Sequence, residues 1–294
     1  MSAVVDFPVR PEARPYLDAF AHRPSGEPEW LGARRRRGLT RFAEQGFPNR
    51  RSEAWRYLDL RALVAEPLLP AGATRGATPC AVPDEIGFPD AADRLALVDG
   101  RFAPELSKLA DLPAGVWLGA MTTAIAARPE LVRAAVAVPG QNGEEPIAAL
   151  NGAFFTDGFV LDVAPGTVLD RPIEILHLAS GEVAGSLHTR SLVALGEDSR
   201  IRLCESYAGS GRYWRNDVLT VRLGAGAGLD RTVLVEEAED ALHLALLGVD
   251  LGARARFESL VLLLRGRTLR SEAHVKSAGE GARCRLHGGF LAAG

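Results

Sequence analysis

The stretch Ser191-Leu-Val-Ala-Leu-Gly-Glu-Asp-Ser-Arg-Ile-Arg-Leu-Cys204 decides the fold, because its pattern returns at a nearly fixed interval. A glycine follows an apolar segment, a small residue stands three places after the glycine, and an apolar residue in most copies stands five places after it. The glycines, spaced 28, 28 and 27 residues apart, are Gly196, Gly224, Gly252 and Gly279. A fixed period of a few tens of residues is typical of solenoids.

Each unit has the pattern of strand, glycine turn and strand, with apolar and polar residues alternating as in half-buried strands. We therefore predict stacked coils from about Asn151 to the end of the chain, in a parallel β-helix or a related β-solenoid. A weaker first copy surrounds Gly166. Glycine is expected in the turns because it accepts positive φ. Facing the core we expect one column made of Ile201, Leu229 and Phe257. The alternative is an ordinary β-sandwich whose spacing is accidental.

The composition limits the classes of function. The 294 residues suffice for about two domains. Hydrophobic residues make up 47% and aromatic residues 6%, which favours aliphatic ladders over an aromatic-lined pocket. The net charge of −3 gives a nucleic-acid partner no electrostatic support. No apolar run is long enough to cross a membrane, and the longest, Leu260 to Leu264, has the length of a buried strand. Because no signal peptide is apparent at the N-terminus, a cytoplasmic location is expected.

The sequence pattern of the first half indicates helices rather than solenoid coils. We therefore expect a helical N-terminal region with a linker over residues 1–145 and a β-helix core over residues 146–294. The predicted elements are a short helix at 14–22, a helix at 29–45, a strand at 94–100, and one or two helices at 121–138 broken at Pro129. Residues 67–89, which include Cys80, form a linker by composition, and residues 139–146 form a loop. The run Arg34–Arg37 is interpreted as a solvated helix face.

Two segments, Gly46 to Leu60 and Leu150 to His177, carry motifs that resemble the SufB/SufD family of the SUF system, which assembles iron–sulfur clusters. Gly46-Phe-Pro-Asn-Arg-Arg-Ser-Glu-Ala-Trp-Arg-Tyr-Leu-Asp-Leu60 resembles the amino-terminal signature of SufD, with Leu58 in place of the usual threonine. Leu150-Asn-Gly-Ala-Phe-Phe-Thr-Asp-Gly-Phe-Val-Leu-Asp-Val-Ala-Pro-Gly166, followed by Asp170 to His177, resembles the entry to the central domain of that family. The first segment favours SufD over SufB.

The resemblance implies a right-handed parallel β-helix core and a role as a scaffold subunit rather than an enzyme. It implies SufB and the ATPase SufC as partners, and an iron–sulfur cluster only as part of the complex, with no intrinsic cofactor. Family members continue beyond the β-helix, whereas this chain stops at Gly294. From this we expect that the C-terminal helical domain is absent, that binding to SufC is weakened, and that the chain self-associates, as a homodimer or aggregate, through its last coil.

Few residues are candidates for site chemistry. No P-loop occurs, and no catalytic residue is assigned. The candidate metal ligands are Cys204, Cys284 and His287. Cys204 and Glu205 could supply a thiolate and a carboxylate to iron, but neighbouring residues on a strand point to opposite faces, so a buried structural cysteine is preferred. Three dispersed histidines could stack along one face of the coils, but ordinary surface or turn positions are preferred for them; they are His188, His243 and His274.

Two rival functions are considered. A β-helix carbohydrate-active enzyme needs acidic groups clustered on one face. The acidic residues of the coils form no obvious cluster; they are Asp217, Asp230, Asp250 and Glu258. The other rival is a β-solenoid scaffold with a different partner.

Overall fold

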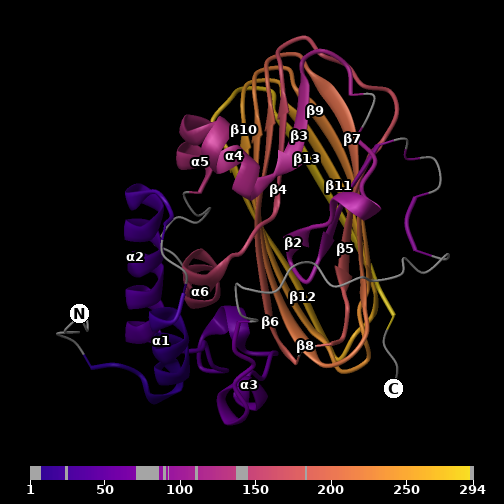
Figure 1. Cartoon of the computed structure of the whole chain (residues 1–294). Coiled ribbons are helices and arrows are strands. Elements are labelled where there is room, and N and C mark those ends of the chain that lie inside the picture. The colour runs from indigo at the N-terminus through magenta and orange to yellow at the C-terminus, as the bar shows by residue number, and fades with distance from the viewer. Residues whose placement is uncertain are drawn as a thin grey trace.

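The computed structural model describes residues 8–23, 26–70, 86–88, 91, 93–109, 112–136, 145–182 and 184–291. Two β-sheets face each other, and helices lie against the outer side of one of them (Figure 1). The helices are α1 Arg14–Ala21, α2 Glu29–Gln45, α3 Arg61–Ala65, α4 Met121–Ala127, α5 Pro129–Ala135 and α6 Pro146–Phe154, with short 3-10 turns at Pro11–Ala13, Glu53–Trp55 and Pro104–Leu106. The strands are β1 Asp93–Val98, β2 Arg101–Phe102, β3 Val116–Ala120, β4 Phe159–Val163, β5 Ile173–Ala179, β6 Gly185–Leu195, β7 Arg200–Gly209, β8 Tyr213–Leu223, β9 Gly228–Glu236, β10 Leu242–Leu251, β11 Arg256–Arg265, β12 Thr268–Ser277 and β13 Arg283–Phe290.

The strand order shows that the chain passes from one sheet to the other at every turn. One sheet, the odd sheet, has the order β13-β11-β9-β7-β5-β1-β2, and the other, the even sheet, has the order β12-β10-β8-β6-β4-β3. From β4 onward every strand pairs in parallel with the strand two places along the chain. This confirms the predicted parallel β-solenoid, preceded by a smaller helical region.

The predicted core column is confirmed. Leu229 pairs in register with Ile201 on one side and with Phe257 on the other. All three side chains are fully buried in a single aliphatic cluster between the sheets. The 28-residue period therefore reflects one complete coil, which returns each apolar position to the same column.

The repeated glycines are needed for a different reason from the predicted one. None of the four has a positive φ. Instead, a Cβ atom on Gly224 would lie 2.8 Å from the backbone nitrogen of Glu197, and one on Gly252 would lie 2.9 Å from that of Ala225. Close stacking of successive turns therefore excludes a side chain.

Positive φ occurs two residues after each glycine. The residues with this conformation are Asp198, Gly226, Arg254 and Gly281, with φ between 53° and 73°. Gly166 belongs to this column, because its amide donates to Glu197 O at 2.7 Å and Ala164 occupies the position equivalent to Gly196. The predicted first copy is thus present but displaced by two residues.

The coils begin at Phe159, not at Asn151 as expected. Asn151 lies in α6, a helix that is buried on all sides, and its side-chain amide donates to Thr189 O and Asn216 O, both at 2.8 Å. An apolar helix of this kind lacks the one-sided pattern that marks a surface helix. The strand-like interpretation of this stretch was therefore wrong.

The helical predictions in the first half hold. α1 and α2 match the two helices expected there, and α4 and α5 are separated at Arg128, before Pro129. β1 matches the expected strand. β1 to β3 extend both sheets, while the domain division at residue 145 stays a prediction. Most of the predicted linker, with Cys80, and most of the 139–146 loop lie outside the described residues.

The arginine run on α2 is only partly a solvated face. Arg36 and Arg37 are exposed, but Arg35 is 4% exposed. Its guanidinium donates to Phe155 O at 2.9 Å and Ala153 O at 3.2 Å, and pairs with Glu27 at 2.7 Å. Arg35 therefore satisfies carbonyl groups at the C-terminal end of α6, where a cation also interacts favourably with the helix dipole.

The apolar run Leu260 to Leu264 forms part of strand β11, as its length predicts, but it is not fully buried. Leu260 is 37% exposed, while Val261 and Leu263 pack toward the interior of the solenoid. Alternate residues of a strand face opposite sides, and no described helix covers the outer face of β11. The prediction of a buried strand was therefore wrong for its outer leucines.

Candidate functional site

Cys204 lies on the outer face of β7, beside a pocket of about 330 Å³. The pocket is lined by Phe88, Pro172, Arg202, Leu203, Cys204, Asp230 and Thr232. Burial, and then the nearby Glu174 carboxylate, raises the pKa of the Cys204 thiol to about 11. The thiol is therefore protonated at neutral pH, in the form that neither binds metal well nor attacks as a nucleophile. Glu205 points into the solenoid, as the strand alternation predicted.

Cys284 and His287 lie on β13 but are not brought together. Cys284 pairs in register with Phe257, in the inward column, and His287 pairs with Leu260, in an outward one. Both side chains are exposed, and His287 Nε2 lies 3.6 Å from Glu258. Burial raises the pKa of the Cys284 thiol. A separation of three residues on a strand places them on opposite faces, so they do not form a joint ligand set.

Inside the solenoid, the ladder of aliphatic side chains near the glycine turns gives way to a buried network of charged groups. Arg215 and Glu237, both 0% exposed, form an ion pair with 2.6 Å between Nε and Oε1. His243 Nδ1 lies 2.8 Å from the same carboxylate, and the Tyr213 hydroxyl donates to its other oxygen. Burial alone would raise the pKa of Glu237, but Arg215 and its other partners outweigh burial and lower this pKa to about 2.

A second ion pair lies beside the first. Arg231 Nε lies 2.6 Å from Glu205 Oε1, and the Tyr207 hydroxyl donates to Glu205 Oε2 at 3.0 Å. The Tyr207 ring stacks on His177 with 4.2 Å between centroids and meets the His243 ring edge-on at 4.8 Å. The contact between Tyr207 and His243 thus joins the two ion pairs into one network, and the stacking on Tyr207 adds His177 to it.

Two members of the network have pKa values that favour their neutral forms. Burial, followed by the positive charge of Arg215, lowers the pKa of His177 well below its ordinary value. Burial raises the pKa of Asp217 despite the nearby Arg215, and the Thr189 hydroxyl donates to its carboxylate. The site therefore combines ion pairs with groups whose pKa values are shifted toward the neutral form.

The geometry indicates a structural role for this network. Its members are all buried, the most exposed being Arg231 at 8%. A substrate in solution has no access to side chains at this depth. Ion pairs in such surroundings lose hydration and contribute little net stability, but removing one partner leaves a charge buried alone and is costly.

The three histidines do not stack along one face, and the preferred surface location is wrong for His188 and His243, which are both buried. In register, His188 lies beside Asn216, His243 beside Arg215, and His274 beside Gly248. Their spacing does not equal one coil, so they occupy different columns and faces. His188 lies beneath α6, with its ring 5.9 Å from that of Phe154.

The buried network itself was missed at the level of sequence, although a signal for it exists. Glu205 and Tyr207 share the strand parity of Ile201 on β7, and Arg215 and Asp217 share that of Val221 on β8. Once one apolar residue is assigned to the core, every second residue on that strand must also face it. Continuing the inward–outward alternation of each strand beyond its last apolar residue would have placed these four side chains inside the solenoid.

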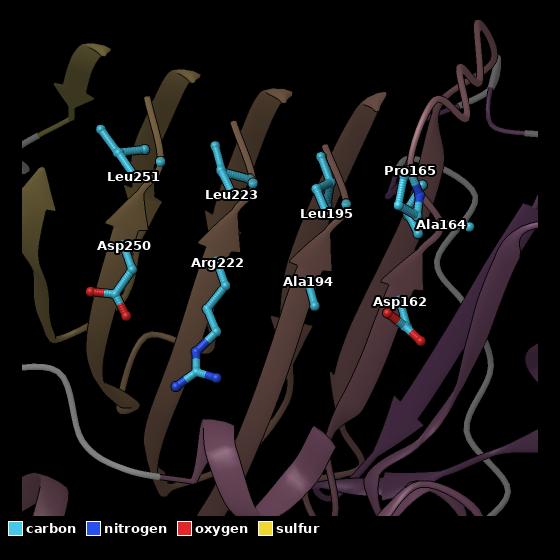
Figure 2. A pocket seen from close by; sticks show the side chains of 13 residues that line it. Asp162, Ala164, Pro165, Ala194, Leu195, Arg222, Leu223, Asp250 and Leu251 are labelled. Carbon is cyan, nitrogen blue, oxygen red and sulfur yellow. The ribbon is translucent and has the colours of Figure 1, made fainter. Parts of the chain in front are cut away.

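The outer face of the even sheet carries a shallow open groove of about 610 Å³, and Figure 2 shows residues that line it. One residue from each of four adjacent strands forms a row across it: Asp162, Ala194, Arg222 and Asp250. Asp162 pairs with Arg128 at 2.7 Å. The row carries a negative, a neutral, a positive and a negative residue in turn, and its two carboxylates stand three strands apart, too far to act as an acid–base pair.

Of the four acidic residues considered for glycoside hydrolysis, only Asp230 and Glu258 lie side by side. Asp217 is buried between the sheets, and Asp250 belongs to the row on the even sheet. Asp230 and Glu258 are neighbours in register on the odd sheet. Within the described ranges no group of three or more His, Cys, Asp or Glu side chains could hold a metal ion. The described helices are all too short or too polar to cross a membrane.

The fold and these contacts define a two-sheet parallel β-solenoid whose even sheet is covered by an N-terminal helical region. Residues 177–294 match the model of the SufBD core domain of SUF system FeS cluster assembly, and residues 73–175 match that of the SufBD protein N-terminal region. The chain therefore belongs to the SufB/SufD family.

A curated relative, described as an iron-sulfur cluster assembly SufBD family protein from a Synechocystis species, is 27% identical over 225 residues. The aligned part covers 72% of this chain and 49% of the relative. The chain thus spans about half the length of the curated relative that it matches.

Proposed function

We propose that the chain is a SufD-like scaffold subunit of a SUF complex and has no catalytic activity of its own. The observation that carries this proposal is the match of both family models to a solenoid whose internal network of charged residues is closed to solvent. Membership of the family supports a role in iron–sulfur cluster assembly, with the cluster as cargo of the complex rather than a resident cofactor.

The choice of SufD over SufB rests on the segment from Gly46 to Leu60. Trp55 of this segment is 4% exposed and lies under the Arg270 guanidinium, 4.2 Å from the ring centroid. The signature tryptophan therefore ties the N-terminal region to strand β12. The separation of Cys204 from Cys284 and His287 further supports a scaffold rather than a cluster-holding subunit.

The partners that we propose are a SufB-like subunit and a SufC-like ATPase, which would supply ATP hydrolysis, in the cytoplasm. Besides the complex with these partners, we test whether the chain associates with copies of itself. The rival carbohydrate-active enzyme is not proposed, because both family models match the SufBD family and only two of the four acidic residues considered, Asp230 and Glu258, lie side by side.

Co-purification tests the proposal. The affinity-tagged chain is co-expressed with SufB and SufC from the same genome, beside a full-length SufD as positive control and the tag alone as negative control. We expect SufB to be retained at a stoichiometric level with the tagged chain. Retention no greater than with the tag alone, while the full-length control retains SufB, would contradict the assignment. Sedimentation of the purified chain reports self-association separately.

A further inference from the structure

The segment from Asn49 to Arg61 presents a basic and aromatic surface on a firmly anchored base. Trp55 and Leu60 are 4% and 3% exposed and belong to the core between the helices and the even sheet. Around these anchors the segment turns its other side chains outward. We call the four most relevant of them the Arg-Tyr patch, defined as Arg50, Arg51, Arg56 and Tyr57, all of which are exposed.

The backbone of this segment is held by successive hydrogen bonds. Ser52 N donates to Asn49 O at 2.9 Å, Trp55 N to Ser52 O at 2.9 Å, and Leu58 N to Trp55 O at 3.1 Å. A segment fixed in this way displays its side chains without a large further loss of backbone entropy when a partner binds. The patch therefore has a preformed backbone.

Tyr57 is the most exposed large side chain of the patch, at 88%. The guanidinium of Arg56 lies 5.6 Å from the centroid of its ring, and Arg50 Nε donates to Arg56 O at 3.2 Å. Tyrosine and arginine are the residues most enriched at the energetic centres of protein interfaces. A tyrosine this exposed contributes little to the fold, so its ring is available to a partner.

The arginines of the patch form no ion pair among the described residues, although Asp59 lies near enough to interact electrostatically with Arg50. Among the described residues, no carboxylate lies within ion-pairing distance of Arg50, Arg51 or Arg56. The neighbouring Arg61, in contrast, pairs with Asp59 at 2.5 Å. Three guanidinium groups without carboxylate partners favour a ligand that supplies carboxylates, because these accept two parallel hydrogen bonds from arginine.

We propose that the Arg-Tyr patch is a docking site for an acidic segment of a partner protein. A nucleic acid fits less well, because three arginines in one short segment, interrupted by Glu53, do not form the extended basic stripe that follows a phosphate backbone. The inference does not rest on the proposed SUF function, since it follows from the patch alone.

Fluorescence anisotropy with labelled poly-L-glutamate tests the inference. The intact chain is compared with a patch variant, Arg50→Gln, Arg51→Gln and Arg56→Gln, and with a matched control variant, Arg36→Gln, Arg37→Gln and Arg256→Gln, which removes equal charge at exposed positions elsewhere. We expect the patch variant to lose about tenfold in affinity and the control to lose less than about twofold, on the scale where tenfold is 1.4 kcal/mol. Binding should weaken as salt increases.

Tyr57→Ala provides a second test that leaves the charge unchanged and spares the buried anchors. We expect a loss of about threefold to tenfold in poly-glutamate affinity, as for truncation of an aromatic interface residue. Equal binding by the patch and control variants, or none by the intact chain at low salt, would overturn the inference. If a single-stranded oligonucleotide binds more tightly than poly-glutamate and depends on the same arginines, a nucleic-acid site replaces the acidic protein partner.

Discussion

Glu237 is the residue on which the buried network depends most, because it accepts hydrogen bonds from three side chains at once. Arg215, His243 and Tyr213 all converge on its carboxylate, and every one of them is buried. An ionised carboxylate at this depth is stable only while its cationic partner remains. The dependence is mutual, so the loss of the carboxylate charge leaves Arg215 buried without a counter-ion.

Replacing Glu237 with Gln should therefore destabilise the fold by about 3–5 kcal/mol, the usual cost of breaking a buried ion pair from one side. Glu239→Gln, two residues away and exposed, is the matched control and should change stability by no more than about 0.5 kcal/mol. Urea unfolding followed by circular dichroism measures both. Equal midpoints for the two variants would show that the ion pair contributes little.

A pH dependence follows from His188, whose pKa is lowered to about 3 by burial and then by the positive charge of Arg23. The unfolded chain takes up this proton near pH 6.5, whereas the folded chain resists it. Stability should therefore fall as the pH drops from about 6.5 toward 3, by up to roughly 1.4 kcal/mol per pH unit for one such histidine. His177, whose pKa is also lowered, acts in the same direction.

Urea midpoints between pH 7 and pH 5 measure this slope, and His188→Gln should make it shallower. Asp217 acts in the opposite direction, because its raised pKa makes the folded chain bind a proton more readily above pH 3.8. A slope that is the same in the variant and the intact chain would show that His188 does not contribute.

Among the elements, the glycine turns set how closely the coils approach. Gly252 meets the backbone of the preceding turn at Ala225 and Gly224, which cannot move aside without disturbing its own coil. Gly228, at the start of β9, instead meets the flexible side chain of Arg200. The same glycine-to-alanine change therefore tests backbone contact in one case and side-chain contact in the other.

We predict that Gly252→Ala destabilises the chain by about 1–3 kcal/mol through overpacking. Gly228→Ala, the matched control, should stay within about 1 kcal/mol of the parent in either direction. Thermal unfolding of the two variants provides the comparison. If both lower the melting temperature equally, the close approach of the turns is not what requires glycine at position 252.

The strands and helices differ in how well the sequence predicts them. Strand periodicity placed Ile201, Leu229 and Phe257 in one column because burial demands the same parity in every coil. Helix α2 was predictable from its apolar positions and from the glycine that follows it. Helix α6 was not, because a helix buried on all sides has no polar face to reveal its period.

The candidate site was less accessible to prediction than the fold. Which charged residue meets which across the two sheets depends on strand register, as for Arg215 and Glu237. Their separation along the chain does not reveal this contact. The sequence alone can tell only that such residues face the interior of the solenoid. Exposure was misjudged at Arg35 and Leu260 for a similar reason, since it depends on which elements cover each face.

At the scale of the whole molecule, the described part of the chain holds no assembled set of metal ligands. We predict that the isolated chain retains no iron–sulfur cluster after anaerobic reconstitution and has no ATPase activity. Iron and sulfide determination and a phosphate-release assay check these outcomes. Stoichiometric iron and sulfide that disappear in Cys204→Ser would show that this thiol is a ligand despite its raised pKa.

The alternation of strands between two sheets also bears on how the chain acquires its structure during synthesis. Each strand from β6 onward pairs with one that left the ribosome about one coil earlier, so a completed coil can serve as a template for the next. β1, in contrast, must wait for β5, which follows it by about 80 residues. Ribosome-stalled nascent chains should therefore become protease-resistant in steps of one coil, starting only after β5 has emerged.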